Sequence, residues 1–146
     1  MEQNSEQKNF SFYYILGLLL VMIFLHFVAN ATYVYQTQIQ NGSVWFDNIL
    51  HTIAGMAFTL LVLWILNRNN LQYSLTTTII FTIACVFCLA TLWELIEFGF
   101  FKIFTSYAQN LNIYSPSIKE AFSDILSNVF GGIIILPFTM KWYKSK

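Results

Sequence analysis

Four long apolar segments dominate this sequence of 146 residues and restrict it to a small set of folds. The first, residues 10–29, has no Asp, Glu, Lys or Arg over twenty positions, enough for a helix to cross a hydrocarbon core about 30 Å thick. Hydrophobic residues make up 57% of the chain, above the usual ~45–50% of soluble domains. These features predict a membrane protein whose spanning elements are helices.

We predict one all-α domain over residues 10–140, with its helices packed as a four-helix transmembrane bundle. The last helix has a clear start signal, because Ser117 and Glu120 follow Pro116 in the form of a capping box. The four predicted helices cover residues 10–29, 45–66, 76–104 and 117–140.

The basic residues predict an orientation. Residues 1–9 are expected to form a polar, disordered tail, and residues 141–146 a basic tail. These tails and the middle loop carry five of the seven Lys and Arg residues, which accumulate on the cytoplasmic side of membrane proteins. Both termini are therefore expected in the cytoplasm, in a bacterial inner (plasma) membrane. With a formal net charge of zero, membrane lipids are the expected partners and nucleic acid is not.

Two carboxylates interrupt the third apolar segment. Glu94 and Glu97 lie about two-thirds of the way along residues 78–101, at i,i+3 spacing on one helix face. An ionisable side chain at that depth costs at least ~2.5–3.5 kcal/mol on insertion scales, so it marks a functional site by default.

The other helices carry polar residues at the same depth. Because successive helices alternate in direction, the second and fourth helices enter the membrane from outside. Asp47 and His51 lie in the first turns of the second helix, and Asp124 and Asn128 in the first turns of the fourth. His26 lies near the outer end of the first helix and is expected to be peripheral. Together they predict a polar pocket that opens toward the outer half of the bilayer.

The predicted pocket holds four carboxylates and two imidazoles, and four negative charges this close cannot all persist in a low dielectric. Either several carboxyls are protonated or a cation neutralises them. The cofactor stays open, with a divalent metal ion as one alternative, because oxygen and imidazole ligands suit Mg²⁺, Mn²⁺, Fe²⁺ and Zn²⁺. Without a metal, a carboxyl and a histidine can act as acid and base. The candidate catalytic or metal-binding residues are Glu94, Glu97, Asp124 and His51, and Asp47 and Asn128 are expected to bind a cofactor or orient the others.

Three motifs resemble the VanZ-like superfamily of small bacterial membrane proteins. They are Asp47-x-x-x-His51, Glu94-x-x-Glu97 and Asp124-x-x-x-Asn128-x-x-Gly131, in that order over roughly residues 45–132. The second Glu replaces the Gln of VanZ proper and is similar to the YjdF-like branch of inner-membrane proteins. The Arg that usually precedes the last helix of VanZ proper is missing, so the resemblance implies a cell-envelope role rather than glycopeptide resistance.

Three functions stay open, and whether the protein is an enzyme stays open with them. The first is action on a lipid-linked or phosphorylated headgroup. The second is an ion- or proton-binding transport element, expected as a homodimer and favoured by any polar path into the inner half of the bilayer. The third is a structural membrane subunit whose carboxylates pair with Lys or Arg of a partner.

Overall fold

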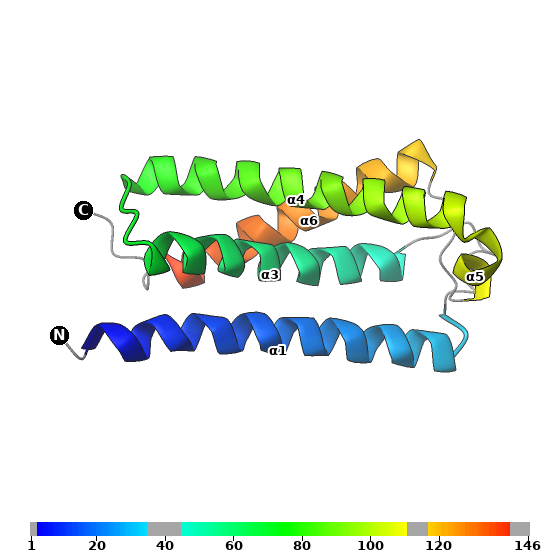
Figure 1. Cartoon of the computed structure of the whole chain (residues 1–146), viewed down its shortest axis with the longest axis horizontal. Coiled ribbons are helices and arrows are strands. Elements are labelled where there is room, and N and C mark those ends of the chain that lie inside the picture. Colours follow the sequence, from blue (N-terminus) through cyan, green and yellow to red (C-terminus); the bar gives the residue numbers. More distant parts are fainter. Residues whose placement is uncertain (1–2, 35–44, 111–116, 141–146) are drawn as a thin grey trace.

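The computed structural model consists of long helices lying side by side (Figure 1). It describes residues 3–34, 45–110 and 117–140, and all regular structure in those ranges is helical, which confirms the predicted all-α fold. The helices are α1 (Gln3–Ala31), α3 (Trp45–Arg68), α4 (Leu75–Ile103), α5 (Thr105–Asn110) and α6 (Ile118–Thr139).

Four helices are long and apolar enough to cross a membrane. The start of α1 and the end of α6 lie at the same end of the bundle, as an even number of spans requires (Figure 1). The four candidate spans are Phe12–Ala31, Trp45–Arg68, Leu75–Ile103 and Ile118–Thr139.

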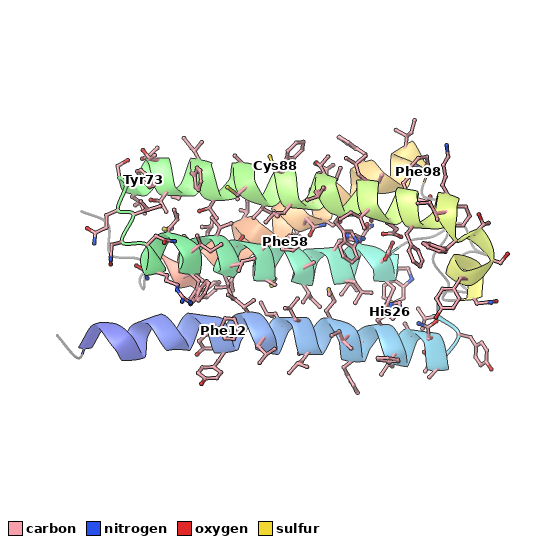
Figure 2. All side chains as sticks on the ribbon, in the orientation of Figure 1. Phe12, His26, Phe58, Tyr73, Cys88 and Phe98 are labelled. Carbon is pink, nitrogen blue, oxygen red and sulfur yellow. The ribbon has the colours of Figure 1, made fainter. Side chains whose placement is uncertain are left out.

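Helix α3 is the centre of the bundle. It packs against α1, α4 and α6, and α4 also packs against α6. Helix α1 contacts α3 alone among the described helices, so most of its apolar side chains project outward (Figure 2). Phe24 and Phe27 are examples, with 65% and 68% of their surface exposed, which suits contact with lipid.

Helix α1 begins at Gln3, seven residues before the predicted start at residue 10. The prediction that residues 1–9 form a disordered tail is therefore corrected for residues 3–9. Residues 3–9 continue the helix instead of being disordered. They include Gln, Glu and Lys and no Pro or Gly, so extending an existing helix through them costs little. The prediction for residues 141–146 lies outside the described residues.

The segment after α4 differs from the predicted polar loop. Residues 105–110 form the short helix α5. The other predicted boundaries agree with the structure to within two residues. The capping box at the start of α6 is present, since the Ser117 hydroxyl accepts from the Glu120 backbone N–H and the Glu120 carboxylate accepts from the Ser117 N–H.

The interior of the bundle changes character along its length. Toward the end of α3 and α6, buried aliphatic side chains form one core cluster, with partly buried residues of α4 packed against it. Toward the start of the same two helices, the buried side chains include the polar residues His51, Asp124 and Asn128, beside Leu50. The members of the aliphatic cluster are Val62, Leu63, Leu66 and Leu136.

Helices α3 and α6 touch backbone to backbone between these two regions. A Cβ atom on Gly55 would lie 1.8 Å from the carbonyl oxygen of Asn128, and one on Gly131 would lie 1.9 Å from that of Thr52. Real Cβ atoms do not approach so closely, so the crossing requires glycine on both helices. Small residues permit such approach in membrane helices.

We expect Gly55→Ala to lower the stability of the fold by at least the ~1–3 kcal/mol typical of overpacking, because the new methyl group would meet backbone that cannot move aside. The measurement is the thermal unfolding midpoint in detergent, with size-exclusion elution as a second readout. Gly99→Ala is the matched control, since nothing lies within 4 Å of a Cβ there and alanine favours a helix. Equal midpoints for the two variants would contradict the glycine-dependent crossing.

Candidate functional site

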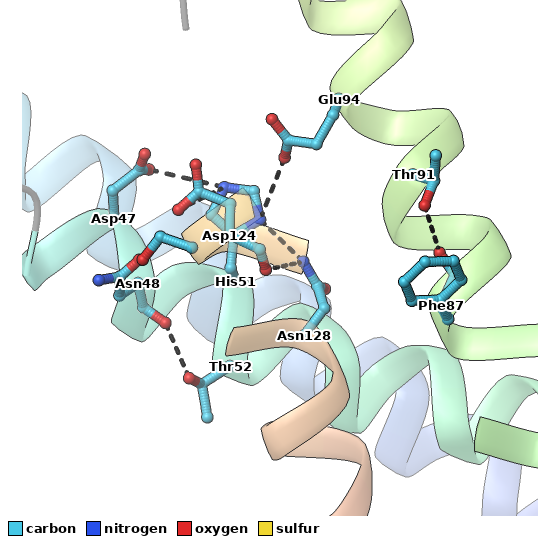
Figure 3. Close-up of polar contacts among 10 residues, drawn as sticks. Asp47, Asn48, His51, Thr52, Phe87, Thr91, Glu94, Asp124 and Asn128 are labelled. Carbon is cyan, nitrogen blue, oxygen red and sulfur yellow. Dashed lines mark hydrogen bonds and ion pairs between the residues drawn. The ribbon is translucent and has the colours of Figure 1, made fainter. Parts of the chain in front are cut away.

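Buried polar side chains gather at one end of the bundle, between α3, α4 and α6 (Figure 3). Four are nearly inaccessible, with 8% of His51, 6% of Glu94, 4% of Asp124 and 1% of Asn128 exposed. The structure thus brings the six residues singled out in the sequence into one region. We call this set the polar cluster: Asp47, His51, Glu94, Glu97, Asp124 and Asn128.

Helical register explains why these residues meet. Asp47 and His51 are one turn apart on α3, and Asp124 and Asn128 are one turn apart on α6, so each pair projects from one face. Glu94 ends a stripe of buried residues that recurs every fourth position along α4. The stripe consists of Thr78, Thr82, Val86, Ala90 and Glu94.

The His51 ring lies at the centre of the cluster. Its Nε2 atom is 3.9 Å from an Asp47 carboxylate oxygen and 4.0 Å from an Asp124 carboxylate oxygen, and its Nδ1 atom is 3.9 Å from a Glu94 carboxylate oxygen. Hydrogen bonds between such groups are about 2.7–3.2 Å long. The imidazole therefore faces three carboxylates across gaps too wide for direct hydrogen bonds.

Asn128 connects the ring to α6. Its Nδ2 atom is 2.9 Å from Nδ1 of His51 and also donates to the backbone carbonyl oxygen of Asp124 at 2.9 Å. The glycine crossing lies directly beside this contact, because a side chain at Gly55 would collide with the Asn128 backbone. Close packing of α3 on α6 thus sets the distance between the imidazole and the amide.

Three buried oxygens of the cluster have no hydrogen-bond partner: Oε1 of Glu94, Oδ1 of Asp124 and Oδ1 of Asn128. Leaving a buried polar atom unsatisfied costs roughly 1–3 kcal/mol, and more for a charged group. A proton, a cation or a hydrogen-bond donor on a ligand would remove that cost.

Two members of the cluster, Asp47 and Glu97, are more exposed than the others. Asp47, in the first turn of α3, has 42% of its side chain exposed, and Glu97 is half-buried. At the same end, the Ser123 hydroxyl donates to the side-chain oxygen of Asn48 at 3.1 Å and ties α6 to α3. The sequence reasoning missed Asn48 and Ser123, although each is adjacent in sequence to a residue of the cluster.

His26 lies on α1, outside the cluster (Figure 2). Its Nε2 atom is 3.1 Å from the side-chain amide nitrogen of Asn30, one turn further along the same helix. The sequence predicts that His26 is peripheral to the site, and that role stays a prediction.

Two groups of potential ligand atoms share His51. One contains Asp47, His51 and Asp124, the other His51, Glu94 and Glu97, and within each group the atoms lie within 4.8 Å of one another. Oxygen donors with one imidazole suit Mg²⁺, Mn²⁺, Fe²⁺ or Zn²⁺. The same groups could exchange protons with a bound molecule, since carboxyl and imidazole are the usual acids and bases of active sites.

A protein-family model described as a predicted membrane protein (DUF2238) matches residues 6–145. No curated protein and no solved structure matches the chain. The family match covers all six residues of the polar cluster and nearly the full length of the four long helices. The chain is therefore a multi-pass membrane protein and belongs to the DUF2238 family of predicted membrane proteins.

Proposed function

We propose that this protein is a VanZ/YjdF-like component of the bacterial cell envelope whose polar cluster acts on the headgroup of a lipid-linked or phosphorylated molecule. One observation carries the proposal: three helices place four carboxylates around a single buried histidine, and two of those carboxylates have an oxygen without a hydrogen-bond partner. Intramembrane carboxyls with no other role than joining helices would be expected to bond to a neighbouring helix.

The proposed location of the site is the outer half of the plasma membrane. The start of α1 and the ends of α3 and α6 lie at the end of the bundle opposite the cluster. Five of the seven Lys and Arg residues are in or near these helix ends in the sequence: Lys8, Arg68, Lys141, Lys144 and Lys146. By the positive-inside rule that end is cytoplasmic, so the cluster would face outward. Asp47, partly exposed at the helix start, gives access from the level of the lipid headgroups.

The chemistry of the cluster limits which part of a headgroup it can contact. All ion pairs of the cluster among the described residues involve His51, and none involves Lys or Arg. Phosphate oxygens would therefore face carboxylate oxygens and would need an accompanying cation. A hydrogen-bond donor or a positively charged group of the headgroup can bind directly.

In this proposal Glu94, Glu97, Asp124 and His51 bind a cation or exchange protons with the headgroup. Asp47 and Asn128 orient them. Helices rather than loops carry all of these side chains, which favours the fixed geometry that acid–base chemistry or selective binding requires.

The test is lipid analysis of bacteria that overproduce the protein, by liquid chromatography and mass spectrometry. We expect the wild-type protein to change the abundance of a lipid-linked headgroup species, and Glu94→Gln or Asp124→Asn to reduce the change at least about tenfold. The reason is that losing one charge-assisted hydrogen bond costs ~1.5–3 kcal/mol.

Lys102→Gln is the matched control, because it removes a charge from α4 at a residue that belongs to neither ligand group. It should keep the wild-type lipid profile. A profile unaffected by the wild-type protein, or changed equally by wild type and both cluster variants, would refute the headgroup proposal.

A second candidate, proton or ion transport, is supported by three buried hydroxyls. Thr59, Thr78 and Thr82 are fully buried, and their hydroxyl oxygens have no hydrogen-bond partner. Helical threonines commonly bond to a carbonyl of the preceding turn, as Thr91 and Thr139 do here. Thr78 and Thr82 lie on the same buried stripe of α4 as Glu94, nearer the cytoplasmic end of the proposed topology, and are separated from Glu94 by Val86 and Ala90.

Proton flux into liposomes tests this candidate. If the hydroxyls form a path, reconstituted wild-type protein should acidify liposomes that contain a pH dye under an imposed potential, and Thr82→Val, which keeps the shape of the side chain, should slow the flux. Thr91→Val is the control, since that hydroxyl bonds to its own helix. Flux no faster than in protein-free liposomes would exclude transport of protons.

A further inference from the structure

The side-chain amide of Asn128 has one orientation that fits its surroundings. Its Nδ2 atom lies 2.9 Å from the backbone carbonyl oxygen of Asp124, which can only accept a hydrogen bond. If the amide were turned over, Oδ1 of Asn128 would lie at that distance from the Asp124 carbonyl oxygen, and two acceptors would face each other. The nitrogen is therefore fixed, and its second hydrogen is left for Nδ1 of His51, 2.9 Å away.

This contact selects one form of the imidazole. Because Asn128 donates to Nδ1, that atom must present its lone pair, and the single ring proton of a neutral histidine is then on Nε2. The Nε2–H group is directed toward the region between Asp47 and Asp124, whose nearest oxygens are 3.9 and 4.0 Å away (Figure 3).

Nε2 of His51 and these two carboxylate oxygens are too far apart to bond to one another directly, at 3.9 and 4.0 Å. The two oxygens and Nε2 all lie within 4.8 Å of one another. An oxygen bound between Nε2 and the Asp124 oxygen, which are 4.0 Å apart, can lie about 2.8 Å from both, which is a normal hydrogen-bond length. Oδ1 of Asp124, nine-tenths buried and without a hydrogen-bond partner, lines this space.

A metal ion fits the same atoms less well. Two ligands at ~2.1 Å from a tetrahedral Zn²⁺ lie about 3.4 Å apart, closer than the 3.9 and 4.0 Å separations here. A histidine that binds a metal through Nε2 normally donates its Nδ1–H to an acceptor, whereas the group beside Nδ1 of His51 is itself a donor.

We infer that Asn128 is a positioning residue that holds His51 as the Nε2–H tautomer, and that the space between His51, Asp47 and Asp124 binds a hydroxyl group of a lipid headgroup. The hydroxyl oxygen accepts from Nε2–H and its hydrogen is donated to Oδ1 of Asp124. This inference rests on the proposed headgroup function and names the part of the headgroup that the site recognises.

The tautomer is measured by NMR on the full chain in nanodiscs, with ¹⁵N-labelled histidine. The chain has two histidines, so His26→Gln leaves His51 as the one signal. Long-range correlations distinguish the ring nitrogens, since Nε2 couples to both ring carbon-bound protons and Nδ1 strongly to only one. We expect a protonated Nε2 and an unprotonated Nδ1. A protonated Nδ1, alone or together with Nε2, would overturn the inference.

Asn128→Asp reverses the role of the amide. Its carboxylate accepts from Nδ1–H, so the proton should move from Nε2 to Nδ1, and the freed Nε2 should bind Zn²⁺ at least about tenfold more tightly than in the wild type. A merely structural Asn128 would leave the protonation pattern unchanged, and that result would contradict its positioning role. The wild-type spectrum decides the tautomer even if this variant does not fold.

The hydroxyl is tested with two lipids that differ in that group. Adding diacylglycerol to the nanodiscs should shift the Nε2 resonance of His51, and triacylglycerol, which has no free hydroxyl, should not. Equal shifts with both lipids, or none with diacylglycerol, would overturn the hydroxyl assignment. These spectra measure binding and need no turnover. The hydroxyl assignment can therefore be refuted while the lipid analysis of cells supports the headgroup function, and the headgroup function can be refuted while the spectra support hydroxyl binding.

Discussion

The backbone contact between α3 and α6 is the constraint on which the rest of the site depends. Gly55 and Gly131 let each helix approach a carbonyl group of the other, and this closeness brings the Asn128 amide within hydrogen-bond distance of His51. Membrane helices gain little free energy from apolar association alone, because lipid tails are as apolar as their side chains. Close packing and the hydrogen bond beside it therefore contribute strongly to the association of α3 with α6. The histidine is thus positioned by the same contact that joins the two helices.

The division of the interior into an aliphatic and a polar region explains how the protein can tolerate an acidic cluster. The aliphatic residues around Val62 and Leu136 pack at one end of the bundle and stabilise it through apolar contacts. The cluster at the other end leaves buried oxygens such as Oε1 of Glu94 unsatisfied, which is an energetic cost to the folded state. Proteins retain such costly arrangements mainly where a ligand or a proton is handled.

The sequence predicted the helices and the membership of the cluster well, because both follow from local patterns. Long uncharged runs specify spans, and i,i+4 pairs such as Asp47 and His51 specify one helix face. It did not predict that α1 would extend to Gln3, since polar helix formers and a polar tail have the same composition. Nor could it give the Asn128–His51 bond or the unpaired threonine hydroxyls, which depend on rotamers and on how deeply two helices interlock.

The central claim is that the polar cluster binds a ligand rather than merely joining helices. The most direct measurement is the mass of the intact protein released from a mild detergent under non-denaturing conditions. The account predicts a near-stoichiometric bound species on the wild type that is missing from a Glu94→Gln/Asp124→Asn double variant with the same helical content and elution volume. Identical masses of bound material on the two proteins, or none on either, would contradict it.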